Sequence, residues 1–263
     1  MEKEKRAVPD ALCADDISRL IGNDALRVTV FDSIDSTNAE ARRQAECGLA
    51  SPALILAEGQ SAGRGRMGRS FFSPSATGLY MSFLTEAKPD LADTVRMTTA
   101  AAVAVASAIE ELCGAEVGIK WVNDIYFRGR KICGILCESF VCGDGKRYAV
   151  IGIGINLYTE EFPKEIKDRA ASLFPKAGVR NALAARITQK LCGFWEHPED
   201  GRIIEYYRAR SIVLGKRVTF CEGGVEREGV AISVDSFGAL RVRTSDGEEK
   251  ILTGGEISLR VNE

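Results

Sequence analysis

The sequence contains a single histidine, His197, and none of its eight cysteines forms a Cys-x-x-Cys pair. Zinc sites usually need clustered Cys and His ligands, and a Ser-His-Asp triad would depend on His197 alone. His197 lies in WEHPEDG, a segment typical of a surface loop, so we assign it no function. Cys133 and Cys137 would share one face of a strand, which leaves a metal or redox role open. Buried thiols in a reducing cytoplasm are the preferred interpretation.

A long apolar run is also missing. No stretch approaches the ~20 consecutive apolar residues of a membrane helix, and the initial MEKEKRAVPD lacks the apolar segment of a secretory signal. Basic and acidic residues nearly balance, 35 against 37, and the pI is near 5.8. This balance argues against a protein that mainly binds nucleic acid or an anionic membrane. We expect a cytoplasmic protein.

The remaining composition is that of a folded chain: 263 residues, of which 45% are hydrophobic and 27% charged. A chain of this length needs neither disulfides nor a structural metal to fold. The patterns predict helices over residues 14–21, 94–112, 181–195 and 202–213, and strands over 27–32, 53–58, 79–84, 120–127, 131–140 and 148–158. After residue 213, short strands are separated by EGG, SFG and SDG turns. We therefore predict an α+β catalytic domain over residues 1–213 and a small β-barrel over 214–263.

One loop is rich in glycine and arginine, AEGQSAGRGRMGRSFFSP over residues 57–74. Its glycines at 63, 65 and 68 form a G-x-G-x-x-G pattern. A dinucleotide-binding loop must run directly into a helix, whereas Pro74, Gly78 and another strand follow here. No Walker A motif is present, and the H-R-D and D-F-G motifs of kinases are also missing. The pattern therefore does not indicate a known nucleotide-binding loop.

The arginines of this loop alternate with the glycines, at Arg64, Arg66 and Arg69. Glycine allows a ligand to approach the backbone, and guanidinium groups donate paired hydrogen bonds to carboxylates and phosphates. The loop therefore favours an anion-binding site. A solvated basic loop, or a patch that contacts RNA phosphates, remains an alternative from these residues alone.

A second polar cluster lies in KWVNDIYFRGRKICG, over residues 120–134. In a strand over 120–127, Lys120, Val122 and Asp124 would share one face. Asn and Asp are unfavourable in the middle of a strand, and residues that break a local preference are expected at functional sites. An Asn-Asp turn between two short strands is the structural alternative. Residues 128–130 (RGR) predict a hairpin turn.

These segments resemble the biotin–protein ligases. Four motifs occur in the family's order: DSTNAEA (35–41), the GRGRMGR loop (63–69), KWVNDIY with KICG (120–134), and GIGIN (152–156). The closing GEISLR (255–260) is similar to the end of the family's C-terminal barrel. The resemblance covers about residues 32–263. It implies a mixed-sheet catalytic domain of the class II synthetase-like biotin/lipoate ligase type, followed by an SH3-like barrel.

The resemblance implies a two-step reaction that uses biotin, ATP and Mg²⁺. The carboxylate of biotin attacks the α-phosphate of ATP, which gives biotinyl-5′-adenylate and pyrophosphate. A lysine of a biotin carboxyl carrier protein, part of a biotin-dependent carboxylase, then attacks the adenylate. Paired sheet edges can also make such proteins homodimers, although no residue here indicates the oligomeric state.

The resemblance also implies roles for individual residues. The biotin site would contain Ser36, Thr37, Asn38, Gln60, Arg64, Gly65, Arg66, Lys131 and Gly134. The ATP site would contain Arg66, Arg69, Lys120, Asn123, Gly152, Gly154 and Asn156. Lys131 and Arg66 would support adenylate formation, and Asp124 would accept the proton of the attacking lysine. No protein-bound metal site is expected. The loop over residues 59–78 should close over the adenylate and exclude water.

Structural alternatives accompany these assignments. Thr37 and Glu40 fit a capping box, with Gly48 as the helix stop, so DSTN could be only a helix cap. GIGIN could reflect close packing of a strand against its neighbour. The chain also departs from the family's frequent pattern, with Phe71 in place of tryptophan and Val122 in place of proline.

Two other functions compete with biotin ligation. A lipoate–protein ligase or octanoyl transferase shares the catalytic fold, but GRGRMGR and KWVNDIY point to biotin. An RNA-binding protein could use the arginine loop and the barrel, although a slightly acidic chain with two tryptophans does not favour this. Some family members carry an N-terminal winged-helix domain and repress transcription. The residues before Asp35 are too few for one, so we predict a monofunctional enzyme.

Overall fold

The computed structural model describes residues 9–49, 52–87, 93–176, 178–198, 200–255 and 257–259. Its helices are α1 (Ala14–Ile21), α2 (Thr37–Glu46), α3 (Thr94–Cys113), α4 (Arg180–Glu196) and α5 (Gly201–Arg210). A first group of strands comprises β1 (Arg27–Ile34), β2 (Ala53–Gln60), β3 (Gly78–Glu86), β4 (Gly118–Lys120), β5 (Asp124–Phe127), β6 (Arg130–Val141) and β7 (Arg147–Asn156). Within the described ranges, none of the helices combines the length and apolarity that a membrane crossing requires.

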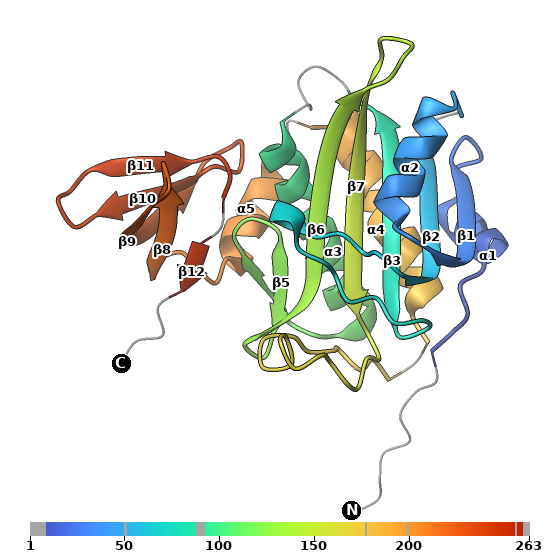
Figure 1. Cartoon of the computed structure of the whole chain (residues 1–263), viewed down its shortest axis with the longest axis horizontal. Helices are drawn as coiled ribbons and strands as arrows, with labels where there is room; N and C mark the ends of the chain where they lie inside the picture. Colours follow the sequence, from blue (N-terminus) through green and yellow to red (C-terminus); the bar gives the residue numbers. More distant parts are fainter. Residues whose placement is uncertain are drawn as a thin grey trace, which may run out of the picture.

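The first seven strands form one sheet in the order β1-β2-β3-β7-β6-β5-β4. The β1–β2 pair is parallel, and the other neighbouring pairs are antiparallel. Figure 1 shows the long β6 and β7 strands at the centre of this sheet, with β1 at one side. The predicted mixed-sheet α+β domain is confirmed.

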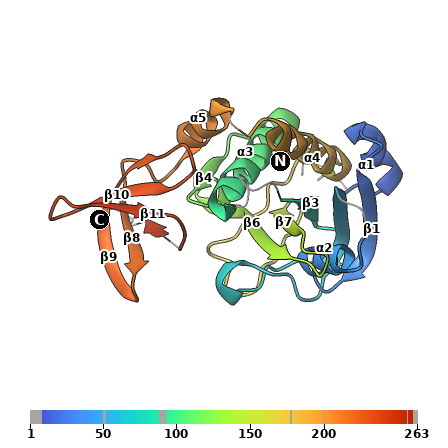
Figure 2. The same cartoon turned by 90° about the horizontal axis from the view of Figure 1, so that it is seen from above.

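The two faces of the sheet have different roles. In β7, Ile151, Ile153 and Ile155 belong to the main hydrophobic core, which they share with α3 and α4. Successive side chains of a strand point to opposite faces, so Gly152 and Gly154 lie on the other face. Helices α1, α3 and α4 cover the isoleucine face, and α2 lies on the glycine face (Figure 2). The alternation of GIGIN therefore separates the core from an open surface.

The C-terminal strands form a second, antiparallel sheet. It contains β8 (Arg217–Glu222), β9 (Val225–Val234), β10 (Leu240–Thr244), β11 (Glu249–Leu252) and β12 (Ile257–Leu259), in the order β11-β10-β9-β8-β12. The predicted small C-terminal β-domain is thus present. Helix α5 ends at Arg210 and β8 begins at Arg217. The predicted boundary at residue 213 lies between them and stays a prediction. Of the GEISLR segment, Glu256 and Arg260 lie outside the described residues.

The two sheets are joined by a close contact. The indole Nε1 of Trp121 donates a hydrogen bond to the carbonyl of Gly238, at 2.9 Å. Gly238 has a φ of +90°, and an added Cβ would lie 2.2 Å from Oγ1 of Thr99 on α3. The turn before β10 therefore packs directly against α3 and beside the segment that follows β4.

Two local predictions were wrong. A continuous strand over 120–127 does not form, because β4 ends at Lys120, residues 121–123 make a turn and β5 starts at Asp124. The structural alternative, a turn between two short strands, is correct. The capping box is displaced, since Ser36 occupies the N-cap of α2 and its side chain makes no capping hydrogen bond. The predicted hairpin turn is confirmed, with Arg128 and Gly129 at φ +49° and +78°.

Candidate active site

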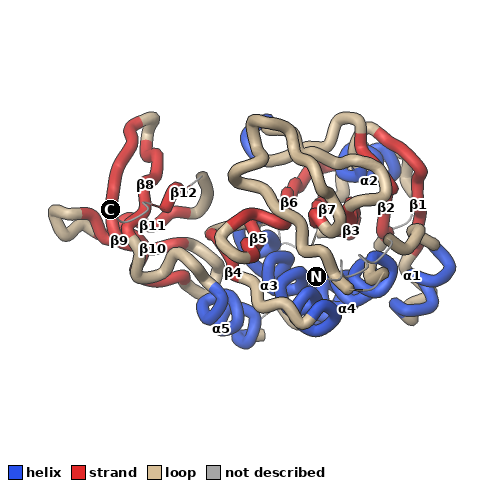
Figure 3. The backbone as a smooth tube through the Cα atoms, turned by 90° about the horizontal axis from the view of Figure 1, so that it is seen from below, coloured by secondary structure: helices blue, strands red, loops and turns tan. Residues whose placement is uncertain are grey.

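A cavity opens on the glycine face of the large sheet. The N-terminus of α2, the arginine loop, the β4–β5 turn, β6 and β7 form its wall, and Gly255 and Ile257 of the C-terminal domain also contact it. Loops cover this face beside α2 (Figure 3). Fifteen of the predicted site residues line the cavity: Ser36, Thr37, Asn38, Gln60, Arg64, Gly65, Arg66, Arg69, Lys120, Asn123, Asp124, Lys131, Gly134, Gly152 and Gly154.

One end of the cavity is formed by uncharged hydrogen-bonding groups. Oε1 of Gln60 accepts from the backbone N–H of Thr37 at 2.9 Å. The hydroxyl of Ser82, fully buried on β3, lies 2.8 Å from the Thr37 hydroxyl and 2.7 Å from Oδ1 of Asn38. The Thr37 hydroxyl also lies 3.2 Å from Oε1 of Gln60, to which it donates. Each hydroxyl carries one proton, so Ser82 shares its proton between Thr37 and Asn38. Thr37, Asn38, Gln60 and Ser82 therefore form one connected network.

The Asn38 amide is held by the protein itself. Its Oδ1 accepts from Ser82, and its Nδ2 donates to the carbonyl of Leu136 at 3.3 Å and to Oε2 of Glu138 at 2.8 Å. A Cβ on Gly152 would lie 2.0 Å from the same Oδ1. Because protein acceptors already occupy the Nδ2 group of Asn38, this side chain shapes the end of the cavity and does not offer a free donor to a ligand.

The glycines of β6 and β7 make room for one aromatic ring. A Cβ on Gly154 would lie 2.5 Å from the ring of Phe71, and one on Gly134 would lie 3.2 Å from it. Gly134 and Gly154 are also opposite each other in the β6–β7 register. The close-packing interpretation of GIGIN is therefore supported. The side chains nearest to Gly152 and Gly154 are those of Asn38 and Phe71, and the assignment of these glycines to ATP stays a prediction.

The arginine loop is a tight hairpin. Arg64 and Ser70 form an antiparallel bridge, and the backbone N–H of Gly65 donates to the carbonyl of Arg69 at 2.7 Å. At its tip, η1 (Arg66–Gly68) places Met67 and Gly68 at positive φ, +56° and +73°. The hairpin explains the spacing of the motif, because glycine at 68 adopts the left-handed conformation easily.

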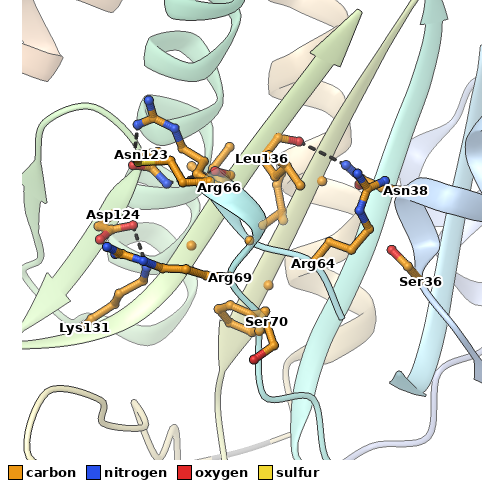
Figure 4. Close-up of a pocket in the computed structure, with 18 of the residues that line it drawn as sticks. Ser36, Asn38, Arg64, Arg66, Arg69, Ser70, Asn123, Asp124, Lys131 and Leu136 are labelled. Atoms are coloured by element: carbon orange, nitrogen blue, oxygen red, sulfur yellow. Dashed lines mark hydrogen bonds and ion pairs between the residues drawn. The ribbon is translucent and has the colours of Figure 1, made fainter. Parts of the chain in front are cut away.

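The loop arginines point to different walls of the cavity (Figure 4). Nη1 of Arg66 donates to Oδ1 of Asn123 at 3.1 Å, and Nη2 of Arg64 lies 3.1 Å from Oε1 of Glu138. Asn123 is fixed in turn by two bonds with the backbone of Ile135 on β6, each 3.0 Å. The β4–β5 turn therefore positions the side chain that receives Arg66.

The charged part of the cavity is strongly basic. Among the described residues, the lining contains one carboxylate, that of Asp124, and five basic side chains, those of Arg64, Arg66, Arg69, Lys120 and Lys131. Nζ of Lys131 lies 2.7 Å from Oδ1 of Asp124. Since the basic groups outnumber that carboxylate, the cavity is suited to a multiply charged anion.

Comparisons with known proteins agree with this geometry. Residues 30–156 match the biotin/lipoate A/B protein ligase family, and residues 213–260 match the biotin protein ligase C terminal domain. The bifunctional ligase/repressor BirA of Bacillus subtilis is 34% identical over 230 residues, which are 84% of this chain and 70% of that protein. The chain belongs to the biotin protein ligase family.

For two further relatives of this ligase, the matched region spans almost the whole length of the relative. The biotin–[acetyl-CoA-carboxylase] ligase of Paracoccus denitrificans is 31% identical over 231 residues, 82% of this chain and 94% of that protein. The structure of the biotin protein ligase from Aquifex aeolicus in complex with biotin and ATP superimposes with a TM-score of 0.75 at 28% identity. It covers 90% of this chain and 99% of the Aquifex chain.

Asn156 is the one predicted site residue of this ligase that is not part of the cavity lining. It ends β7, is 5% exposed, and its Oδ1 has no hydrogen-bond partner among the described residues. A buried amide oxygen without a partner is unfavourable. Its assignment to the nucleotide stays a prediction.

Sequence reasoning missed two residues that support the ligase site, Ser82 and Glu138. Ser82 is a hydroxyl in the otherwise apolar LYMSFL strand, and this exception to the pattern is a usable signal. Glu138 lies four positions after Gly134 and therefore on the same face of β6, which the strand period predicts. Neither belongs to a motif that we quoted.

The cysteines of this ligase do not form a metal site within the described ranges, where no cluster of three His, Cys, Asp or Glu residues occurs. Burial raises the pKa of the Cys137 thiol to about 12 and that of Cys133 further. A raised pKa disfavours the reactive thiolate. Cys47 and Cys221 are exposed, so burial does not describe all eight. His197 is exposed after α4, as predicted.

Proposed function

We propose that this chain activates biotin with ATP as biotinyl-5′-adenylate and transfers the biotinyl group to a lysine of a biotin carboxyl carrier protein. The observation that carries the proposal is the division of the cavity. One end consists of neutral donors and acceptors, and the rest of the lining, as far as the structure describes it, carries five basic groups against one carboxylate. Biotin combines a neutral ureido ring with a carboxylate, and ATP supplies the second anion.

The neutral end would bind the ring system. Ser36, Thr37 and Gln60 present hydroxyl and amide groups there, and the Ser36 hydroxyl is not used to cap α2. A ureido group needs matched donors and acceptors, and leaving one unpaired is costly. Gly152 and Gly154 fit this end better than the nucleotide end, since they lie beside Asn38 and Phe71.

The basic end would bring the two anions together. Arg64, Gly65 and Arg66 would lie at the junction of biotin carboxylate and α-phosphate, and Lys131 would bridge both groups. Preorganised cations stabilise the charge that develops at phosphorus, and stabilisation of this kind commonly contributes most to the rate of such a reaction. Arg69, Lys120, Asn123 and Asn156 are the candidates for the nucleotide side.

Mg²⁺ would enter with the nucleotide. The described residues contain no cluster of three acidic, Cys or His ligands, and Mg²⁺ is often held by one or two carboxylates together with phosphates. Asp124, the carboxylate among the described lining residues, is paired with Lys131, so the phosphates of the nucleotide would supply the protein-independent ligands of Mg²⁺. When bound, Mg²⁺ would neutralise phosphate charge, while the arginines and Lys131 position the reacting oxygens.

The second step requires a neutral amine, although a free lysine has a pKa of about 10.4. Asp124 would accept the ammonium group of the carrier lysine and then its proton. Because Asp124 is paired with Lys131, movement of Lys131 onto the new phosphate would free the carboxylate for this role. Closure of the arginine loop would exclude water from the adenylate.

Biotin-dependent exchange of labelled pyrophosphate into ATP tests the proposal. We expect exchange with biotin and none with lipoate, followed by transfer to a carrier domain when one is added. Exchange that requires lipoate would support the rival ligase, and no exchange with either acid would overturn adenylate chemistry. We further propose a cytoplasmic location. We also propose a homodimer formed by pairing of sheet edges, for which β1 is an outer strand of the large sheet.

A further inference from the structure

The carboxylate of Glu138 contacts two separate walls of the active site. Its Oε2 accepts from Nδ2 of Asn38 at 2.8 Å, and its Oε1 lies 3.1 Å from Nη2 of Arg64. Asn38 belongs to the first turn of α2, and Arg64 belongs to the arginine loop. Glu138 itself lies on β6, outside the cavity lining. One side chain thus connects the neutral end of the cavity to the hairpin.

The contact with Asn38 fixes an amide that has little freedom. Asn38 is 5% exposed, and its other Nδ2 contact, to the carbonyl of Leu136, is long at 3.3 Å. A hydrogen bond from a neutral donor to a carboxylate is stronger than a neutral pair. Loss of Glu138 would therefore leave Nδ2 with one weak acceptor and weaken the position of the Oδ1 that receives Ser82.

The contact with Arg64 limits the movement of the hairpin. The Arg64 side chain is 50% exposed and that of Glu138 is 30% exposed, so the ion pair is screened and its strength is modest. Its importance is geometric, because Arg64 starts the hairpin at the bridge to Ser70. Holding this position keeps the following arginine directed toward Asn123.

We propose that Glu138 is a positioning residue, which aligns Asn38 for biotin and holds the arginine loop over the cavity before ligand enters. The inference rests on the proposed function, because it assigns the neutral end to biotin. It predicts two separable defects, one for each carboxylate oxygen. Loss of the Arg64 contact should loosen the loop, and loss of the Asn38 contact should weaken binding of biotin.

Two substitutions separate these defects. In Glu138→Gln the amide oxygen can still accept from Asn38, but its NH₂ group faces the guanidinium of Arg64 and cannot pair with it. Glu138→Ala removes both contacts. Trypsin cleaves after arginine, so the rate of cleavage after Arg64, Arg66 or Arg69 in the ligand-free protein, identified by mass spectrometry, reports on the loop. Calorimetric titration with biotin reports on the Asn38 end.

We expect Glu138→Gln to raise the cleavage rate about threefold or more, because an exposed ion pair is lost, with biotin affinity within about twofold of wild type. Glu138→Ala should raise cleavage similarly and weaken biotin binding about tenfold, since a nearly buried donor loses its charged acceptor. The matched control is Glu86→Gln, which removes an exposed ion pair with Lys146 at 2.9 Å, outside the cavity lining. It should change neither readout.

Unchanged cleavage in both Glu138 variants, or unchanged biotin affinity in Glu138→Ala, would overturn the proposal. Equal effects in Glu86→Gln would also overturn it, because they would reflect general loss of surface charge. Failure of the wild-type protein to bind biotin would instead refute the proposed function, and the cleavage rates would still test the Arg64 contact. A thermal unfolding midpoint shared by wild type and Glu138→Gln distinguishes loop release from general unfolding.

Discussion

The side chain of Lys131 reaches Asp124 by passing over Gly134. In the β5–β6 register Asp124 is opposite Gly134, and Lys131 is opposite Tyr126. A Cβ on Gly134 would lie 3.2 Å from Nζ of Lys131, so the glycine leaves just enough room for the ammonium group. The final glycine of KICG is thus explained by the 2.7 Å contact between Lys131 and Asp124.

This contact leads to a prediction about the two half-reactions. Lys131→Ala should reduce biotin-dependent pyrophosphate exchange by at least about 10²-fold, because loss of one preorganised donor costs about that much. Asp124→Ala should retain exchange and chiefly slow transfer from preformed biotinyl-adenylate to the carrier. Single-turnover assays with the adenylate separate the two steps. The opposite pattern, with exchange lost only in Asp124→Ala, would refute our assignment of roles.

The missing side chain of Gly152 gives a second prediction. A Cβ there would lie 2.0 Å from Oδ1 of Asn38 and displace the amide, and such overpacking costs about 1–3 kcal/mol. Gly152→Ala should therefore weaken biotin binding about tenfold or more, at about 1.4 kcal/mol per tenfold. Calorimetric titration with biotin measures the change.

Gly193→Ala is the matched control for Gly152→Ala. Gly193 lies inside α4 with no atom within 4 Å of an added Cβ. Alanine is favoured over glycine in a helix interior by about 1 kcal/mol, so this variant should be slightly more stable and bind biotin as wild type does. Unchanged binding in Gly152→Ala would show that Asn38 has no part in the biotin site.

Much of this fold is predictable from sequence because periodicity reports burial. The isoleucines of GIGIN belong to the core and the glycines to the cavity, as a period of two requires. The positions of Arg64, Arg66 and Lys131 in the cavity were predicted from residue type together with the resemblance to the biotin–protein ligases. Strand periodicity and short motifs are local patterns, so a single sequence is enough to recognise them.

The failures concern contacts between distant segments. Nothing near Trp121 in the sequence indicates that its indole donates a hydrogen bond to the carbonyl of Gly238. Trp121 is the first residue of the turn that replaces the predicted strand. Likewise, Ser36 takes the N-cap of α2 while the Thr37 hydroxyl lies near Gln60 and Ser82. Tertiary hydrogen bonds override the local capping preference, and a single sequence does not specify such partners.

The contact between the two domains provides a third prediction. Gly238→Ala places a Cβ 2.2 Å from Oγ1 of Thr99 at a φ of +90°, which combines a clash with an unfavourable backbone conformation. We expect a loss of about 2–4 kcal/mol in urea unfolding. Gly247→Ala is the control, because φ is +86° but no atom lies within 4 Å. Equal losses in both variants would show that backbone conformation, not docking on α3, accounts for the effect.

The last prediction concerns acid stability at Asp35, the first residue of DSTN. Its carboxylate accepts two hydrogen bonds from Arg43, at 2.7 and 2.9 Å, and these bonds lower the Asp35 pKa from 3.8 to about 2. A lowered folded-state pKa stabilises the fold above the unfolded value, and the benefit is lost as the pH falls from about 4 toward 2. Asp35 is 46% exposed, so screening limits the effect to under about 1 kcal/mol.

Asp35→Asn should therefore be slightly less stable than wild type above pH 5, and the difference should close as the pH approaches 2. Urea unfolding between pH 3 and pH 7 measures it, with Asp32→Asn on β1 as the control, since Asp32 takes part in none of the ion pairs described. A difference that stayed constant down to pH 3 would mean that the loss arises from packing or from the bond to the Ser36 N–H. If the stability difference between wild type and Asp35→Asn instead grew as the pH fell, the folded-state pKa of Asp35 would have to be raised and not lowered. Only a raised folded-state pKa gives stability that increases at lower pH.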